Sequence, residues 1–211
     1  LDSAVDLDVS AAVAVAVGVE LVIGLAIALA LQKQRWARDL TRSMLLAPMF
    51  ITPIAVGLTF RFLLNDQLGA IPELLRGIGI SYDFFGPGRA LFTIAFIDVW
   101  QWTPFMMLLI LAGLQSMPRD IQEAARVDGA TSFRLFRELT LPHLRRFIEL
   151  GAVLGAIYLV NTFDAVYMMT SGGPGVSSSN LSYYIYQRAF LGFDIGQSAA
   201  MGVVVVILTL L

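Results

Sequence analysis

The chain alternates between long apolar stretches and shorter polar connections. Five apolar stretches cover residues of about 9–31, 43–64, 90–114, 147–169 and 195–211. A helix needs about 20 residues to cross a hydrocarbon core some 30 Å thick, so the first four are long enough and the fifth is cut short. Lipid cannot satisfy exposed backbone amides, so each stretch is predicted to be helical. The pattern predicts an all-α membrane protein, a polytopic helical bundle forming one transmembrane domain over residues 1–211.

Composition agrees with a chain that lies in lipid. Hydrophobic residues make up 57% of it, charged residues 14%, and the mean hydropathy is +0.76. About a quarter of an ordinary soluble domain is charged. The net charge of -2 gives no indication of a nucleic-acid partner. With no cysteine and one histidine, His143, the sequence excludes disulfide and thiolate chemistry and predicts no metal site.

Small residues and prolines inside the stretches predict how the helices pack and bend. Two small-xxx-small pairs in the first stretch favour close helix approach, namely Ala14 with Gly18 and Gly24 with Ala28. Kinks are predicted at Pro48, Pro53 and Pro104.

Basic residues predict the orientation. Ten of the fourteen fall in the connections 32–42 and 115–146, which are Lys33, Arg35, Arg38, Arg42, Arg119, Arg126, Arg134, Arg137, Arg145 and Arg146. By the positive-inside rule that side is cytoplasmic. Leu1 is then expected outside and Leu211 toward the cytoplasm. The chain starts without Met, so we expect an excerpt of a longer protein with at least one span before Leu1.

The cytoplasmic connection contains the segment EAARVDGATSFRLFRELTLP, residues 123–142, which predicts two short helices with a sharp bend. Pro118 favours a helix start, and residues 121–127 carry good helix formers. Gly129 can adopt the positive φ that ends a helix. Thr131 or Ser132 can cap a second helix to about Leu139, before Pro142 limits it.

This segment resembles the coupling motif of the membrane-spanning subunits of ATP-binding-cassette importers. The match covers Glu123, Ala124, Ala125, Asp128, Gly129, Ala130, Phe136, Leu141 and Pro142. The resemblance implies a coupling helix that fits a cleft on a separate ATPase subunit, and a six-helix core. Arg146 stands where the sugar-importing branch commonly has a second proline.

Residues 161–200 resemble the carbohydrate-importing, maltose-type branch of that family. The matching positions are Thr170, Gly172, Gly173, Pro174, Tyr184, Ile185, Tyr186, Ala189 and Phe190. Residues 171–175 predict a turn at the outer face, and residues 181–191 predict a short helix. Its tyrosines, Tyr183, Tyr184 and Tyr186, are expected at interfacial depth, where they can form a membrane-interface belt.

Polar and aromatic residues inside two stretches predict a substrate path, because intramembrane polar groups usually face a wet cavity or the bundle interior. On the fourth stretch, Tyr158, Asn161, Asp164 or Ala165, and Met168 recur at helical spacing. On the third, the set is Asp98, Gln101, Trp102 and Phe105. Amides and carboxylates bind sugar hydroxyls, and rings pack on sugar faces. The resemblance makes Asn161 the first candidate contact. Asp98, Asp164 and Glu20 can instead join helices.

No GxxxxGK[ST] phosphate loop is present, so this chain is expected to be no enzyme and to bind no cofactor itself. The resemblance implies a permease subunit in the bacterial cytoplasmic membrane. Its implied partners are an ATPase dimer that binds ATP and Mg, a second permease and an extracytoplasmic solute-binding protein. Two alternatives are a proton-coupled carrier using Glu20, Asp98 or Asp164, and a membrane-embedded aspartyl hydrolase using Asp98 and Asp164. Arg61 gives some support to an anionic substrate.

Overall fold

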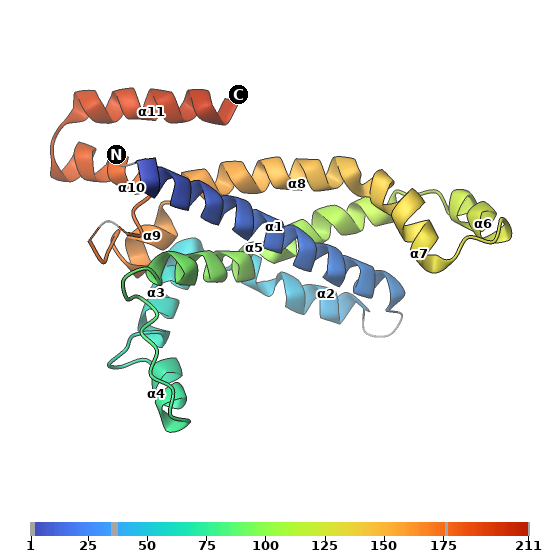
Figure 1. Ribbon diagram of the computed structural model, residues 1–211, viewed down its shortest axis with the longest axis horizontal. Coiled ribbons are helices and arrows are strands. Elements are labelled where there is room, and N and C mark those ends of the chain that lie inside the picture. The colour runs from blue at the N-terminus through green and yellow to red at the C-terminus, as the bar shows by residue number, and fades with distance from the viewer. Residues whose placement is uncertain (1–2, 35–37, 176, 211) are drawn as a thin grey trace. The chain divides into compact units, whose positions relative to one another are not determined.

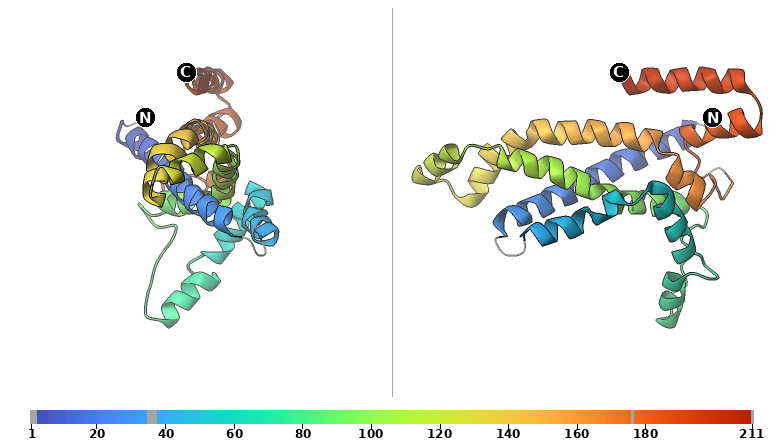
Figure 2. Two further views of the ribbon diagram at one scale, coloured as in Figure 1. Left: turned by 90° about the vertical axis from the view of Figure 1, so that its right-hand side faces the viewer. Right: turned by 180° about the vertical axis from the view of Figure 1, so that it is seen from behind.

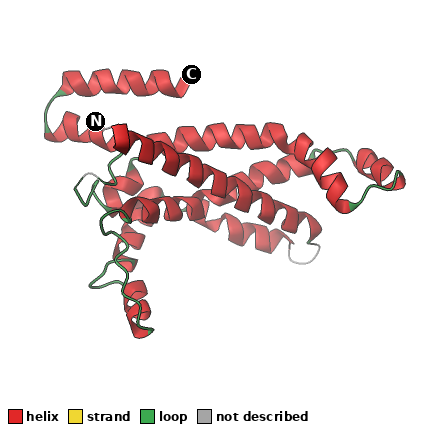
Figure 3. Cartoon of the chain, in the orientation of Figure 1, coloured by secondary structure: helices red, strands yellow, loops and turns green. Residues whose placement is uncertain are grey.

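The computed structural model describes residues 3–34, 38–175 and 177–210, and its secondary structure there is entirely helical (Figures 1 and 3). The predicted all-α fold class is confirmed. Arg35, Leu1 and Leu211, which enter the predicted orientation, lie outside the described residues. The elements are α1 (Ser3–Lys33), α2 (Arg38–Leu46), a 3-10 turn η1 (Ala47–Phe50), α3 (Pro53–Leu63), α4 (Ala70–Gly77), α5 (Ala90–Gln115), α6 (Arg119–Val127), α7 (Ser132–Leu135), a π-helical turn η2 (Phe136–Thr140), α8 (Leu141–Asn161), α9 (Asp164–Met169), α10 (Leu181–Tyr186), a second π-helical turn η3 (Gln187–Leu191) and α11 (Ile195–Leu210).

The chain divides into two compact units. The described part of unit 1 lies within residues 1–16, 51–98 and 156–211, and that of unit 2 within 17–50 and 99–155. Helices α1, α5 and α8 contribute residues to both units.

Unit 1 has an apolar core built from α3, the first turns of α5, α9 and α10. Its buried side chains include Val56, Ile97 and Val166. Helix α3 lies beside α9 (Figures 1 and 2). The two helices approach closely at Gly57, where an added Cβ would lie 2.8 Å from the Cβ of Met168. A larger residue at this position would push the two helices apart.

Unit 2 has its own core, formed by the second half of α1, α5 and the start of α8. Gly24 lies so close to α5 that an added Cβ would be 2.9 Å from both the Cβ of Met106 and the backbone N of Met107. Ala28, one turn later, is fully buried. Gly18, by contrast, has no neighbouring atom within 4 Å of its Cβ position. The prediction of close helix approach therefore holds for Gly24 and Ala28 and fails for Gly18.

Among the described residues, two helical segments are long and apolar enough to cross a membrane, Val13–Gln32 and Ala90–Gln115. A third candidate is a bent pair, Asp39–Phe50 with Pro53–Leu63, whose halves meet at 87°. The segment Ile195–Ile207 is apolar and shorter. The prediction that residues 43–64 form one kinked helix thus needs correction, because the chain leaves the helix at Ile51 and Thr52. Pro53 disfavours helical geometry in Thr52, which is extended, and takes the first position of α3.

Candidate functional site

The bend predicted around Gly129 is present in unit 2, and residues 118–142 are called the elbow below. Pro118 is extended (φ -61°, ψ 133°) and precedes α6, which ends at Val127. Gly129 then has a φ of 81°. Its N–H donates to the carbonyl of Arg126 at 3.1 Å, and that of Ala130 donates to the carbonyl of Ala125 at 2.9 Å. This pattern is a Schellman-type helix end, which requires the left-handed conformation that glycine adopts without strain. The conformational prediction for Gly129 is confirmed.

The sequence predicted either Thr131 or Ser132 as the cap of the second helix of the elbow, and the structure shows that the cap is Thr131. Thr131 is the N-cap of α7, and its side-chain oxygen accepts from the backbone N–H of Arg134 at 3.4 Å. Arg134 also pairs with Glu138 at 3.0 Å, one turn further on. Both of these side chains are exposed, so the ion pair stabilises the elbow only slightly.

The prediction that this helix stops before Pro142 is wrong. The helical path continues from α7 through the π-helical turn η2 into α8, and Pro142 is the second residue of α8. Proline has no N–H and its ring collides with the carbonyl four residues earlier in a regular α-helix. A π-helical turn bonds residues five apart, so it widens the helix where that collision would occur. The Thr140 hydroxyl, five residues after Leu135, donates to the Leu135 carbonyl at 3.4 Å.

The outer surface of the elbow is a mixture of charged and apolar side chains. The matched motif residues Glu123, Ala124, Asp128, Gly129, Leu141 and Pro142 are exposed, whereas Ala125 and Phe136 are half-buried. Val127 and Phe133 were missed by the motif comparison and are 87% and 70% exposed. Both side chains are therefore accessible to a partner.

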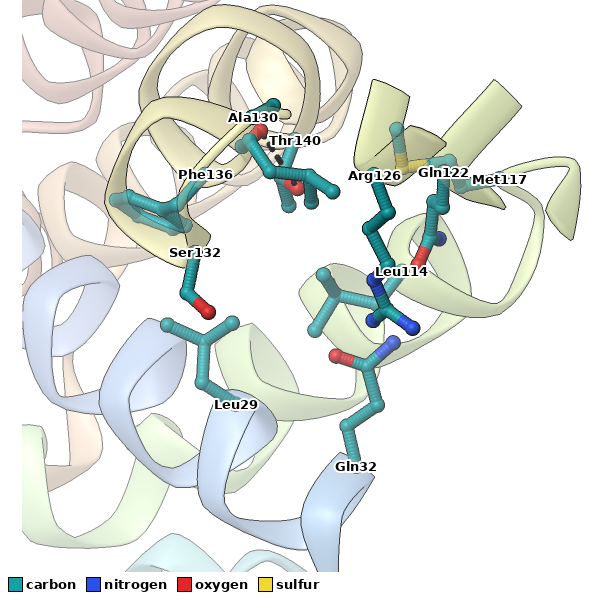
Figure 4. A pocket seen from close by; sticks show the side chains of 11 residues that line it. Leu29, Gln32, Leu114, Met117, Gln122, Arg126, Ala130, Ser132, Phe136 and Thr140 are labelled. Carbon is teal, nitrogen blue, oxygen red and sulfur yellow. Dashed lines mark hydrogen bonds between the residues drawn. The ribbon is translucent and has the colours of Figure 1, made fainter. Parts of the chain in front are cut away.

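The inner side of the elbow faces a cavity of about 600 Å³ within unit 2 (Figure 4). Its walls come from the ends of α1 and α5 and from α6, α7 and η2. Polar side chains on the wall are Gln32, Gln122, Arg126, Ser132 and Thr140. Figure 4 shows the guanidinium of Arg126 pointing into the cavity, with the amides of Gln32 and Gln122 at the same end.

In unit 1, the predicted path residues of the fourth stretch do not lie on one continuous helix. Helix α8 ends at Asn161 and α9 starts at Asp164, so the expectation that Tyr158, Asn161, Asp164 and Met168 share one helical face is corrected. The Asn161 amide folds back to donate to the carbonyl of Ile157 at 2.7 Å, and the Thr162 hydroxyl donates to that of Tyr158 at 3.1 Å. Such side-chain bonds compete with helix continuation.

The backbone carbonyls freed by this break are satisfied from the start of α10. The Asn180 amide donates to the carbonyl of Thr162, and the Ser182 hydroxyl donates to that of Val160 at 3.3 Å. Asn180 also caps α10, since its side-chain oxygen accepts from the N–H of Tyr183 at 3.0 Å. The carbonyls of Val160 and Thr162 are thus hydrogen-bonded although the helix is interrupted there. Membrane proteins tolerate interrupted helices when the freed backbone groups find such partners.

Around the break, the path residues differ in exposure. Asn161 is exposed, whereas Tyr158, Asp164 and Met168 are half-buried. The guanidinium of Arg61 donates to the carbonyl of Met168 at 3.1 Å, so this cation is directed at the end of α9. A cation at a helix C-terminus is favourable because of the helix dipole.

The path residues of α5 are spaced three and four apart along one helix, in keeping with a shared face. Asp98 and Gln101 are buried, with 5% and 4% of their surface exposed. Trp102 and Phe105 are half-buried and meet edge to face, with ring centroids 6.4 Å apart. Asp98 belongs to unit 1 and the other three residues belong to unit 2.

An aromatic cluster follows the break in unit 1. Phe163 stacks on Tyr167 at 5.2 Å between centroids and packs against Tyr186 at 5.1 Å. A hydrogen bond with Tyr167 raises the pKa of Tyr186 above its ordinary value. Tyr183 is 4% exposed in the core of this unit. The expectation of an interfacial belt is therefore wrong for Tyr183. This burial could not be predicted from local sequence, because Phe163 and Tyr167, which pack against Tyr183, lie well before it in the chain.

Residues 171–175 form the predicted turn. Gly172 and Gly175 have positive φ, and the Gly173–Pro174 peptide is cis. Ser178 stabilises the turn, since its hydroxyl donates a hydrogen bond to the carbonyl of Gly173 at 2.6 Å. Within the described residues, no group of three His, Cys, Asp or Glu side chains is placed to hold a metal ion.

Comparison with known proteins gives one matching family and many relatives. Residues 21–211 match the model of the family described as binding-protein-dependent transport system inner membrane component. The chain is 37% identical over 171 residues to the sulfoquinovosyl glycerol transport system permease protein SmoG of Agrobacterium fabrum, covering 80% of this chain and 56% of SmoG. It is 35% identical over 175 residues to the trehalose/maltose transport system permease protein MalF of Thermococcus litoralis, covering 82% and 59% respectively. The chain thus spans less than two thirds of these relatives.

Solved structures share the fold. A chain of a bacterial ABC transporter involved in the import of the acidic polysaccharide alginate superposes with a TM-score of 0.81 at 20% identity, over 94% of this chain and 73% of that one. A chain of the MetNI methionine ABC transporter in an inward-facing conformation superposes with a TM-score of 0.66 at 20% identity, over 96% and 87%.

Proposed function

Because this chain belongs to the family of binding-protein-dependent transport system inner membrane components, we propose that it is a permease subunit of an ATP-binding-cassette importer for a carbohydrate or polyol. The observation that carries the proposal is the elbow, a helix–turn–helix with a left-handed Gly129 in which charged residues flank the exposed Val127 and Phe133 along the chain. Such a surface fits a cleft on a separate protein.

The proposed mechanism assigns the energy source to other subunits. A partner ATPase dimer binds ATP and Mg and closes, and α6 and α7 move with it. The helices joined to the elbow, α5 and α8, then change between inward-open and outward-open arrangements around a path near the middle of the membrane. A second permease and an extracytoplasmic solute-binding protein complete the complex. Its proposed location is the bacterial cytoplasmic membrane, which several helices of this chain cross.

The substrate class is proposed from the path residues and from the substrates that the names of relatives mention. Asn161, Asp164, Asp98 and Gln101 offer amides and carboxylates for hydroxyl groups, and Tyr158, Trp102 and Phe105 offer rings. The names of the relatives mention sulfoquinovosyl glycerol and trehalose or maltose. A proton-coupled carrier or an aspartyl hydrolase would have no use for an elbow that docks an ATPase, so the importer is favoured.

Photo-crosslinking tests the docking surface. Val127 is replaced with benzoyl-phenylalanine in the chain expressed with its ATPase subunit, and the same replacement at Phe96, 73% exposed in the membrane span of α5, is the matched control. We expect irradiation to join position 127 to the ATPase and position 96 to lipid or a membrane subunit. An assembled complex that hydrolyses ATP but gives no crosslink to the ATPase from position 127 would contradict the proposal.

Uptake measurements test the path. We expect Asn161→Ala to lower substrate uptake about fivefold, because a lost hydrogen bond to a ligand is worth about 1 kcal/mol and 1.4 kcal/mol corresponds to a factor of ten. Assembly should be unchanged, since the Asn161 side chain is exposed. Ser182→Ala is the control, because it removes a long hydrogen bond at the same break without touching the Asn161 amide. Equal losses in both variants would assign the effect to the break and remove Asn161 from the path.

A further inference from the structure

The cavity behind the elbow combines a cation and amides with several apolar side chains, which is the chemistry that an amphiphilic anion requires. One end carries the Arg126 guanidinium and the amides of Gln32 and Gln122 (Figure 4). The lining also includes the apolar side chains Leu29, Leu114, Met117, Leu135 and Phe136 and the hydroxyls of Ser132 and Thr140, with Leu114 and Met117 at the same end as Arg126. A volume of about 600 Å³ lies within the range of ligand sites, about 300–1,000 Å³.

The charge of the cavity is uncompensated. No carboxylate lies on its wall among the residues that the structure describes. Among the residues that the structure describes, ion pairs join Arg76, Arg134 and Arg145 to acidic side chains, whereas none is found there for Arg126. A guanidinium with free N–H groups, next to two amides, is suited to the oxygens of a phosphate group.

The position of the cavity along the membrane normal indicates which kind of anion it binds. The membrane-crossing segment of α1 ends at Gln32 and that of α5 at Gln115, so Gln32 and Leu114 mark the polar end of both spans. The basic residues of the flanking connections favour the cytoplasmic side for this end. Headgroups of the inner leaflet lie at that level, and basic pockets between helices on the cytoplasmic side bind anionic headgroups.

We propose that this cavity binds the phosphate headgroup of an anionic phospholipid of the inner leaflet, with Arg126 and the two glutamines on the phosphate and the apolar wall against the glycerol and upper acyl chain. The bound lipid fills the space between the elbow and the ends of α1 and α5. It thereby supports α6 from behind while the outer surface of the elbow is left for a partner.

Lipid retention in the assembled complex tests the proposal. Complexes carrying the native chain, Arg126→Gln, Arg126→Lys or Arg137→Gln are purified from vesicles of phosphatidylcholine mixed with phosphatidylglycerol. The lipids that remain bound after washing with detergent are counted by native mass spectrometry. Arg137→Gln is the matched control, because Arg137 is an exposed arginine of the elbow that does not line the cavity.

We expect the native chain and Arg137→Gln to retain phosphatidylglycerol in preference to phosphatidylcholine. Arg126→Gln should lose this preference at least fivefold, since the phosphate contact is removed, and Arg126→Lys should keep part of it. Arg126 can alternatively act only by stabilising the C-terminal end of α6 through the helix dipole. In that case the variants will differ in thermal stability to the same extent in both lipids, and this result would overturn the proposal of a lipid site. Equal retention by Arg126→Gln and the native chain, or a native chain without preference for phosphatidylglycerol, also overturns it. ATP hydrolysis is not the readout, so a failure of the transport proposal leaves this result interpretable.

Discussion

Replacing Gly129 with valine is expected to abolish the stimulation of ATP hydrolysis by substrate in the assembled complex. The φ of 81° at Gly129 is open to glycine, whereas a β-branched residue there is strained by at least about 1–2 kcal/mol. No atom lies within 4 Å of the Cβ position, so the cost arises from backbone conformation and not from crowding. The helix end at Arg126 and Ala130 would open, and α6 would lose its angle to α7. Hydrolysis is measured with and without the substrate-loaded binding protein.

Two variants separate backbone conformation from other effects at Gly129. Gly129→Asn should keep most of the stimulation, because asparagine tolerates the left-handed region. Gly79→Val carries the same backbone cost, since Gly79 has a φ of 82° and open space around its Cβ position, but lies outside the elbow. It should leave stimulation intact. Normal stimulation in Gly129→Val would remove the elbow from the coupling mechanism.

Replacing Gly24 with valine is expected to prevent normal assembly of the chain. An added Cβ would lie 2.9 Å from the backbone N of Met107 and 3.1 Å from the backbone carbonyl carbon of Met106, and backbone atoms of a packed helix cannot yield as a flexible side chain can. Overpacking of this kind costs about 1–3 kcal/mol or more, which corresponds to a loss of roughly 2–12 °C in the melting temperature of a chain of this size. The yield of assembled complex and its melting temperature are the measurements.

Gly18→Val is the matched control for Gly24→Val. It places the same side chain on the same helix, where no atom of this chain lies within 4 Å of the Cβ position. We expect near-native yield and melting temperature. If Gly24→Val assembles with native stability, the packing of α1 against α5 at Met106 and Met107 is incorrect.

The elbow could be predicted from the sequence because its determinants are local. Gly129 ends α6, and Thr131 caps α7 with a bond to a residue three positions later. The continuation through Pro142 could not be predicted, because proline normally limits a helix and the widened turn that accommodates it depends on the backbone of η2.

The helix interruptions after Asn161 and before Pro53 could not be predicted from the hydrophobic pattern of the sequence. Hydrophobicity alone cannot distinguish a continuous span from two helices of the same polarity. The break after Asn161 is held by Asn180, which lies 18 residues beyond its acceptor Thr162, and no local pattern encodes that partner. Likewise, Pro53 predicted a kink, whereas the chain leaves the helix at Ile51 and Thr52 and α3 begins anew at Pro53.

The π-helical turn η2 has a mechanical consequence for the joint between α7 and α8. It accommodates one residue more than a regular α-helical turn would, at Phe136–Thr140. If that residue were absorbed into regular winding, α7 would rotate about the helix axis by about 100° and advance by about 1.5 Å relative to α8. The connection between α7 and α8 therefore allows one discrete rearrangement, in which η2 becomes regular α-helix. A force on the elbow can drive this rotation and shift while both helices stay wound.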